Sequence, residues 1–252
     1  GFFPVAPARK RALCTFEYTY FARPDSRIGG QLVYPAREEM GARLATEHHV
    51  DADLVIGVPD SAIPAAIGYA RGSGIPYREG LVKNRYVGRT FIQPDQRIRE
   101  AGVSLKFNAL SDVLNGKRVI VVDDSIVRGT TTPRVINLIR RAGAKEVHMR
   151  ITTPPIISPC FLGVDMATKA ELIAANQSIE EIRQHIGADS LGYLSIDGLN
   201  RSTGQPPNDL CNACFTGVYP LNVQMQMDKL EAARMREPVL VAAESLNRAG
   251  GP

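Results

Sequence analysis

Two adjacent carboxylates and a loop rich in hydroxyl side chains follow one apolar stretch of the chain. The stretch is Val119–Val122, and Asp123 and Asp124 come directly after it. The next residues, Ser125–Thr132, include Gly129 and lead toward the start of a predicted helix. Unpaired backbone N–H groups at a helix start carry partial positive charge and bind phosphate well. The carboxylates suit the vicinal hydroxyls of a ribose or a Mg²⁺ ion, so the pattern predicts a sugar-phosphate site. The simpler alternative is an Asp helix cap followed by a polar turn.

Four cysteines form the second group of residues with possible chemistry. Two of them, Cys211 and Cys214, make a Cys-x-x-Cys pair, whereas Cys14 and Cys160 lie far away in the sequence. No secretory signal is evident, so disulfides are not the expected state. A redox pair, a tetrahedral Zn²⁺ site, an iron–sulfur cluster and four unrelated buried thiols all fit the spacing.

Positive charge is concentrated between Arg78 and Arg118. This stretch has nine basic and four acidic residues, a net charge of +5, whereas the whole chain carries +4. Within it, Lys83–Lys106 shows no regular period and contains Gly88, Pro94 and Gly102. A long segment of this kind in a compact domain is usually functional, so we expect a basic lid over a polyanionic ligand. A solvated basic loop is the alternative.

The surrounding elements alternate between strands and helices, which predicts an α/β fold with a mostly parallel sheet flanked by helices. Short apolar runs predict strands at Asp53–Val58, Ile75–Leu81, Arg118–Asp123, Glu146–Ile151 and Leu191–Leu199. Helices are expected at Pro35–His49, Ser61–Arg71, Thr168–Asn176 and Ile179–Ile186, and from Thr132 to a stop at Gly143. The chain divides into an N-terminal connector at 1–34, a main domain at 35–200 and a C-terminal segment at 201–252.

Composition excludes several classes of protein. With 44% hydrophobic and 22% charged residues, the 252-residue chain is neither disordered nor of low complexity. No apolar run reaches the roughly 20 residues of a membrane span, and no Gly-Lys-Ser/Thr triplet forms a Walker loop. Trp is absent and aromatic residues are 6%, so a stacking platform for nucleic acid is not expected. The histidines form no catalytic triad, and we expect all four, His185 in its charged helix included, to be structural.

The loop after the strongest strand resembles the 5-phosphoribosyl 1-pyrophosphate (PRPP) loop of type I phosphoribosyltransferases. Its form Asp123-Asp-Ser-Ile-Val-Arg-Gly-Thr-Thr131 is similar to that of the glutamine PRPP amidotransferases. Four further stretches resemble the same family, at Cys14–Ser26, Gly57–Ser61, Lys83–Ile92 and Cys211–Gly217, and so does Ser158-Pro-Cys160-Phe. The resemblance runs from about Cys14 to Pro220 and implies the type I phosphoribosyltransferase fold with a flexible lid.

The resemblance implies a role for each matching residue. Ser61, Asp123 and Asp124 correspond to Mg²⁺-PRPP positions, and Lys83 and Arg85 to pyrophosphate contacts that act in catalysis with Tyr86. The substrate-binding residues implied are Pro59, Asp60, Ser61, Asp123, Asp124, Ser125, Ile126, Val127, Arg128, Gly129, Thr130 and Thr131. The family branch with cysteines in these contexts binds one [4Fe-4S] cluster, which makes Cys14, Cys160, Cys211 and Cys214 its implied ligands.

The activity implied is transfer of phosphoribose from Mg-PRPP to ammonia, giving 5-phosphoribosylamine and pyrophosphate, the first committed step of purine synthesis. The family also has an amino-terminal glutaminase domain, whereas this sequence begins Gly1-Phe-Phe-Pro. We therefore expect use of free ammonia without glutamine, with the glutaminase half removed or on a separate chain. A cytoplasmic homotetramer inhibited by purine nucleotides is also implied, with neither membrane nor nucleic acid as a partner. The alternative is a non-catalytic sensor of PRPP or nucleotides on the same fold.

Overall fold

The most apolar run of the sequence forms the centre of a parallel sheet. In the computed structural model, which describes residues 11–84, 107–164 and 168–221, the sheet has the order β4-β7-β8-β9. These strands are β4 (Leu54–Gly57), β7 (Arg118–Asp123), β8 (Glu146–Ile151) and β9 (Ser190–Tyr193). All three pairings are parallel, which confirms the predicted α/β architecture.

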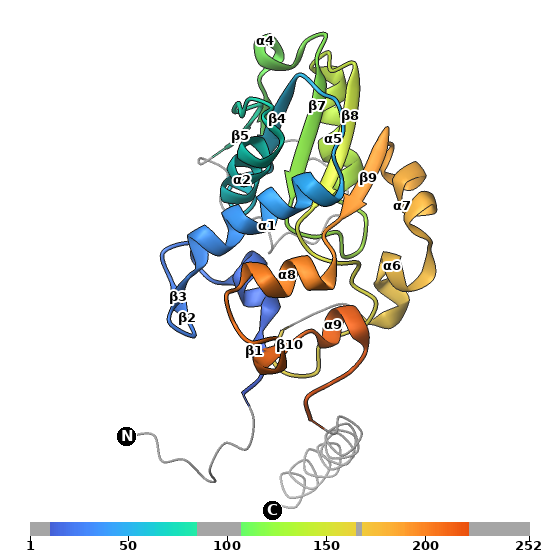
Figure 1. Cartoon of the computed structure of the whole chain (residues 1–252). Coiled ribbons are helices and arrows are strands. Elements are labelled where there is room, and N and C mark those ends of the chain that lie inside the picture. The colour runs from blue at the N-terminus through green and yellow to red at the C-terminus, as the bar shows by residue number, and fades with distance from the viewer. Residues whose placement is uncertain (1–10, 85–106, 165–167, 222–252) are drawn as a thin grey trace, which may run out of the picture.

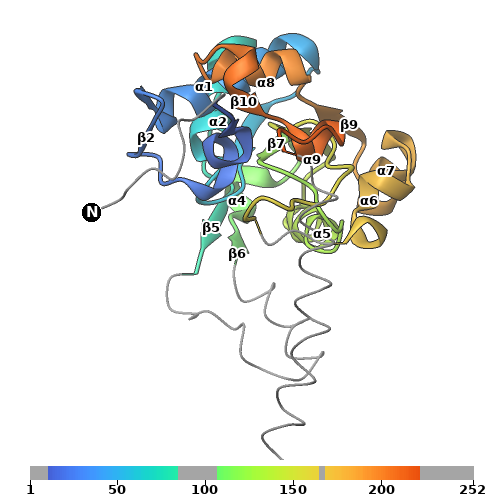
Figure 2. The same ribbon diagram turned by 90° about the horizontal axis from the view of Figure 1, so that it is seen from below.

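The sheet separates two hydrophobic cores, because successive side chains of a strand point to opposite faces. Val119 and Val121 belong to the core that contains α5 (Thr132–Arg141) and α7 (Ile179–Ile186). Ile120 and Val122 belong to the core with α1 (Val33–Glu47), α2 (Ile63–Ser73) and α8 (Ile196–Ser202). Figures 1 and 2 show α1 and α2 on one face of the sheet and α5 on the other. The result is a three-layer arrangement with β7 buried on both faces.

Helices α1 and α2 approach each other closely because their contact is made of small residues. A Cβ atom at Gly41 would run into the Ala65 carbonyl, and one at Gly68 would run into the Glu38 carbonyl. The small-residue composition of the Ser61–Arg71 region therefore serves helix–helix contact as well as packing on the sheet.

Short elements surround this sheet. Three two-stranded pairs are β1 (Leu13–Cys14) with β10 (Leu210–Cys211), parallel, and β2 (Arg27–Ile28) with β3 (Gln31–Leu32) and β5 (Leu81–Lys83) with β6 (Phe107–Ala109), both antiparallel. The helical turns are η1 (Glu17–Phe21), α4 (Ser111–Leu114), η2 (Lys169–Glu171), α6 (Ile173–Asn176), η3 (Pro207–Asp209) and α9 (Ala213–Thr216). Figure 1 places β1, β10 and α9 at the end of the molecule opposite α4.

Three predicted elements differ from the structure. Ile75–Leu81 is not a strand: Tyr77 makes one isolated bridge with Val55, since Pro76 has no N–H to donate to a ladder. The predicted strand Leu191–Leu199 ends at Tyr193, because the Ser195 hydroxyl accepts from Gly198 N and starts α8. The predicted helix Thr168–Asn176 is split into η2 and α6 at Leu172, whose backbone is extended.

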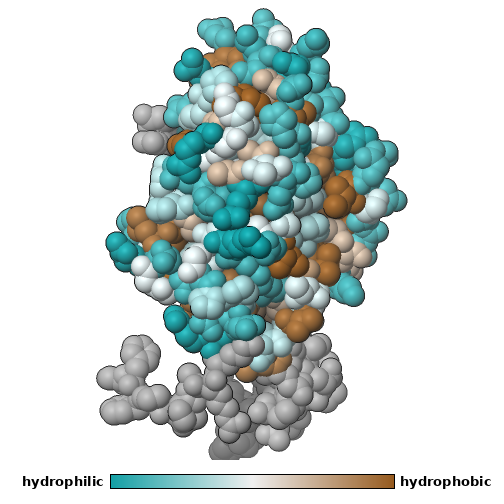
Figure 3. Space-filling view, in the orientation of Figure 1, coloured by the Kyte–Doolittle hydropathy of each residue, from teal (hydrophilic) through white to brown (hydrophobic). Residues whose placement is uncertain are grey.

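Most of the predicted lid, residues 85–106, lies outside the described residues, as does the tail from residue 222. Among the described helices, none has the length and apolar character needed to cross a membrane. The face drawn in Figure 3 is largely hydrophilic, with hydrophobic residues in small separate groups.

Candidate functional site

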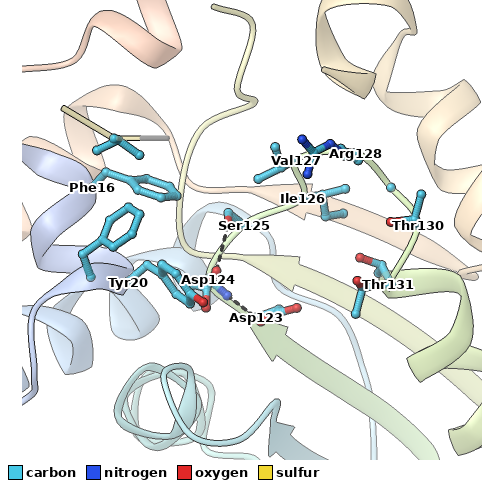
Figure 4. Close-up of a pocket in the computed structure, with 14 residues that line it drawn as sticks. Phe16, Tyr20, Asp123, Asp124, Ser125, Ile126, Val127, Arg128, Thr130 and Thr131 are labelled. Atoms are coloured by element: carbon cyan, nitrogen blue, oxygen red, sulfur yellow. Dashed lines mark hydrogen bonds between the residues drawn. The ribbon is translucent and has the colours of Figure 1, made fainter. Parts of the chain in front are cut away.

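A pocket of about 370 Å³ lies at the carboxyl end of β7, where open α/β sheets bind ligands. It is lined by Asp123–Thr132, and by Phe16, Tyr20, Phe21 and Val164. Figure 4 shows Phe16 and Tyr20 on one side of the pocket, with the loop from Ser125 to Thr131 around the other. The structure thus brings the predicted acid pair and the predicted hydroxyl-rich loop into one cavity.

The two carboxylates at the end of β7 are held differently. Asp123 Oδ1 accepts from the Asp124 backbone N–H at 2.9 Å, whereas Asp124 accepts from two hydroxyls, Ser61 Oγ at 2.6 Å and Ser125 Oγ at 2.7 Å. Burial raises the pKa of Asp123 well above its ordinary value, and the neighbouring Asp124 charge adds to this. Burial also raises the pKa of Asp124, while the hydroxyls of Ser61 and Ser125 and the Arg37 cation oppose that rise. A buried acid pair of this kind gains from a cation or from hydroxyl donors in the pocket.

A buried arginine supports the aromatic side of the pocket. Arg37 on α1 is 2% exposed and donates from Nε to the Tyr18 carbonyl at 2.8 Å and from Nη2 to the Ala22 carbonyl at 2.7 Å. These bonds fasten the turn η1, which carries Tyr20 and Phe21. Burial lowers the pKa of Arg37, and the nearby Asp124 charge partly restores it. The same guanidinium therefore serves both the aromatic turn and the acid pair.

The loop after β4 forms a second, smaller pocket of about 140 Å³. Pro59, Asp60 and Lys83 line it together with Tyr77 and Glu79. The Lys83 ammonium lies 2.6 Å from Asp60 Oδ2, and both side chains are largely exposed. Ser61 joins this loop to the larger pocket through its bond to Asp124. The predicted residues are consequently split between two neighbouring pockets with Ser61 at their junction.

Two predicted site residues lie outside the part of the chain that the structure describes, and a third is paired with a residue that lines neither pocket. Arg85 and Tyr86 lie outside the described residues. Arg128 lines the larger pocket, but its Nε lies 3.2 Å from Glu171 Oε1. It therefore forms an ion pair with Glu171 and not with Asp123 or Asp124. Gly129 has a φ of +67°, which only glycine adopts readily, and this turns the loop toward Thr130 and α5.

Several residues of the site had no role in the sequence analysis. Phe16, Tyr20 and Phe21 form the aromatic side of the pocket, and the Thr153 hydroxyl donates to the Asp124 carbonyl at 3.1 Å. The aromatic residues fall within the Cys14–Ser26 stretch that resembles the family, and this resemblance was the one indication in the sequence that they belong to the site. Nothing in the local sequence of Thr153 or Arg37 indicates such a contact, because each comes from a distant element.

The four cysteines converge from three parts of the chain. Cys14 and Cys211 are register partners in β1 and β10, and the Cys214 carbonyl accepts from the backbone of Ile157 and Ser158, close to Cys160. All four are free thiols. Burial raises the pKa of Cys214 to about 12, and the other three thiols contribute to this rise. The thiols therefore lie near one another, although no three His, Cys, Asp or Glu side chains in the described part of the chain have the arrangement of a metal site.

Comparison with known proteins agrees with this geometry. Residues 31–152 match a family model described as a phosphoribosyl transferase domain. The chain is 58% identical to an amidophosphoribosyltransferase of Methanocaldococcus jannaschii over 218 residues, 86% of this chain and 46% of that protein. It is 56% identical to the Bacillus subtilis amidophosphoribosyltransferase over 217 residues, 84% of this chain and 46% of that protein.

A solved structure has the same fold. The glutamine PRPP amidotransferase from B. subtilis complexed with ADP and GMP superimposes with a TM-score of 0.80 at 55% identity, covering 86% of this chain and 49% of that one. The chain spans about half the length of these relatives. The chain therefore contains a phosphoribosyl transferase domain and is similar to the half of the amidophosphoribosyltransferases that carries this domain.

Proposed function

We propose that this chain transfers phosphoribose from Mg-PRPP to ammonia, giving 5-phosphoribosylamine and pyrophosphate. The observation that supports this most directly is the pocket in which Asp123 and Asp124 face the loop Ser125–Thr132. A sugar phosphate offers hydroxyls to the carboxylates and a phosphate to the backbone of the loop. The second pocket, at Pro59 and Asp60 with Lys83, would take the pyrophosphate.

The donor groups of this site fit Mg²⁺. Asp123, Asp124 and the Ser61 hydroxyl supply only oxygen atoms, and Mg²⁺ is often held by one or two carboxylates together with substrate phosphates. Burial raises the pKa of both Asp123 and Asp124, so a bound cation would offset the cost of burying their charges. When bound, Mg²⁺ would offset the negative charge of the pyrophosphate leaving group.

The reaction proposed is a displacement at C1 of the ribose. The bond from C1 to the pyrophosphate oxygen breaks and its electron pair leaves with pyrophosphate. The lone pair of ammonia forms the new C1–N bond, and the resulting ammonium group loses one proton to solvent. No nucleophilic side chain is required, because positioning and electrostatic stabilisation carry the reaction. The loop would hold the 5-phosphate, the carboxylates would accept from the ribose hydroxyls, and Phe16, Tyr20 and Phe21 would limit the access of water to C1.

Arg85, Tyr86 and the rest of the basic segment to Lys106 extend this proposal. They would contact pyrophosphate and cover the substrate as a lid, in keeping with the net charge of +5 between Arg78 and Arg118. Ammonia would come from a glutaminase domain or subunit in the whole protein. Purine nucleotides as inhibitors, a homotetramer and a cytoplasmic location are further parts of the same proposal.

The cysteines are proposed to hold a [4Fe-4S] cluster with a structural role. The convergence of four free thiols from β1, the 157–160 segment and β10–α9 supports this, because thiolates are the ligands of such clusters. Iron and acid-labile sulfide measured on anaerobically purified protein should each be present at about four atoms per chain. Stoichiometric zinc without sulfide would reject the cluster.

The activity is tested by pyrophosphate release. PRPP, Mg²⁺ and ammonium should give pyrophosphate, and no pyrophosphate should form when ammonium is left out. The double variant Asp123→Asn/Asp124→Asn should bind no Mg-PRPP and release nothing. PRPP binding without any pyrophosphate release would instead favour the sensor.

A further inference from the structure

The outer side of the loop after β7 is fastened to residues 168–186, which we call the brace. The brace comprises η2, α6 and α7 and follows the residues that match the family model. Its Ile173 N–H donates to the Val127 carbonyl at 3.0 Å, and Glu171 pairs with Arg128 at 3.2 Å. On α7, His185 Nε2 lies 3.1 Å from the Gly129 carbonyl. Three consecutive loop residues are therefore each held by a different residue of the brace.

These contacts orient the backbone donors of the loop. In a trans peptide the C=O of one residue and the N–H of the next point in opposite directions. Because the Val127 and Gly129 carbonyls accept bonds from the brace, the N–H groups of Arg128 and Thr130 point away from it. Inward-pointing N–H groups are what an anion in the loop requires.

In the hydrogen bond between His185 and Gly129, the histidine is the donor. A backbone carbonyl only accepts, so the His185 Nε2 atom carries the proton and donates it to Gly129. Space at this point is limited, since a Cβ atom on Gly129 would lie 2.5 Å from Ile173 Cδ1 and 3.5 Å from His185 Cδ2. The brace and the loop are thus fitted to each other around a glycine.

The brace is itself well supported. Ile182 and Ile186 of α7 are 0% and 2% exposed in the core that also contains α5. Ser178 and Glu181 form a capping box at the start of α7. Glu171 accepts from Thr168 N at 3.0 Å and Oγ1 at 2.9 Å, which orients its carboxylate toward Arg128. Because α7 is anchored in the core, its contacts with the loop hold the loop backbone in a fixed position.

We propose that the brace positions the loop for the 5-phosphate of the substrate, and that His185 is the positioning residue at Gly129. This inference rests on the proposed function and replaces the purely structural role expected for His185. The second pocket, at Pro59 and Asp60, has no contact with the brace among the hydrogen bonds and ion pairs of the described residues. The effect should therefore be confined to ligands that carry the 5-phosphate.

The experiment measures two affinities by calorimetry, one for ribose 5-phosphate and one for magnesium pyrophosphate. His185→Leu lacks the donor and should raise the dissociation constant for ribose 5-phosphate about fivefold to tenfold. A loss of this size is typical when one hydrogen bond is removed. His185→Gln, whose amide can donate to Gly129, should recover most of it. Glu171→Gln should show a smaller loss, and pyrophosphate affinity should stay within about twofold in all three.

A matched control is Glu180→Gln, which removes the ion pair with Arg183 on the same helix but away from the loop. It should leave both affinities unchanged. Equal ribose 5-phosphate affinity in wild type and His185→Leu would overturn the positioning role, as would a parallel loss of both ligands with a lowered Tm. Failure of the wild type to bind ribose 5-phosphate would instead reject the proposed function, so the two failures are distinguishable.

Discussion

The Ser61 hydroxyl donates a hydrogen bond of 2.6 Å to Asp124 Oδ2 across 63 positions of the sequence. It joins the loop after β4 to the loop after β7, since these two parallel strands are neighbours in the sheet. The bond also orients one carboxylate of the acid pair and lowers its pKa relative to burial alone. It is the direct link between the two pockets of the site.

Ser61→Ala should therefore impair substrate use more than folding. Losing a hydrogen bond to a charged group costs roughly 1.5–3 kcal/mol, so the KM for Mg-PRPP should rise at least about tenfold. Ser61→Thr retains a hydroxyl and should recover part of the loss. Steady-state kinetics with PRPP as the varied substrate measures this, and an unchanged KM in Ser61→Ala would remove Ser61 from the site.

Asp123→Asn should make the chain more stable while abolishing pyrophosphate release. The pKa of Asp123 is raised in the folded state, so the folded protein binds more protons than the unfolded chain between pH 4 and that raised pKa. Stability therefore falls as the pH rises through this window, and the amide avoids the loss. The gain in Tm should be present at pH 7 and should shrink toward pH 4.

The control for this prediction is Asp112→Asn, an exposed carboxylate on α4. It should change neither Tm nor activity. A lower Tm for Asp123→Asn at pH 7 would contradict the unfavourable burial of its charge.

Asp53 should show the opposite pH dependence. Its carboxylate accepts from the Arg118 backbone N–H at 2.8 Å and from Nη2 at 3.0 Å, and these bonds lower its pKa. Such a group stabilises the fold above its unfolded pKa, near 3.8, and the contribution is lost as the pH falls through the folded value. Asp53→Asn should lower Tm by a few degrees at pH 7, and wild type and variant should converge in acid. Thermal scans at several pH values decide this, and a difference that grows in acid would contradict it.

Lys83→Met should weaken pyrophosphate recognition with little effect on stability. The ion pair of Lys83 with Asp60 joins exposed side chains, and such pairs contribute little to folding. Loss of the ammonium should raise the KM for PRPP about tenfold or more, because the proposed function places this charge opposite the pyrophosphate. Lys117→Met, another exposed lysine, serves as the control for general charge loss. Equal kinetics in both variants would exclude Lys83 from the site.

The sequence predicted correctly those helices and strands whose own residues determine their secondary structure. β7 was predictable because its run Val119–Val122 is apolar throughout, as in a buried parallel strand, and α5 because Pro133 lies in its first turn. α8 was missed because the Ser195 cap interrupts a run that otherwise favours a strand.

The site was predictable only in part, for a related reason. Asp123–Thr132 is contiguous, so its chemistry is visible in the sequence. Arg37, Tyr20 and His185 reach the site through tertiary packing, and no spacing in the chain relates them to the loop Asp123–Thr132.

The pairing of β1 with β10 connects the region of the four cysteines to the aromatic side of the larger pocket. Thr15 bonds to the Cys211 carbonyl at 2.9 Å across 196 positions, and Phe16, the first aromatic residue of the pocket, comes next. Shortened versions of the protein that omit either strand would release the partner strand and the aromatic side of the cavity together. Oxidation of the thiols should for the same reason alter the pocket at which we propose that the sugar binds, although no thiol lines that cavity.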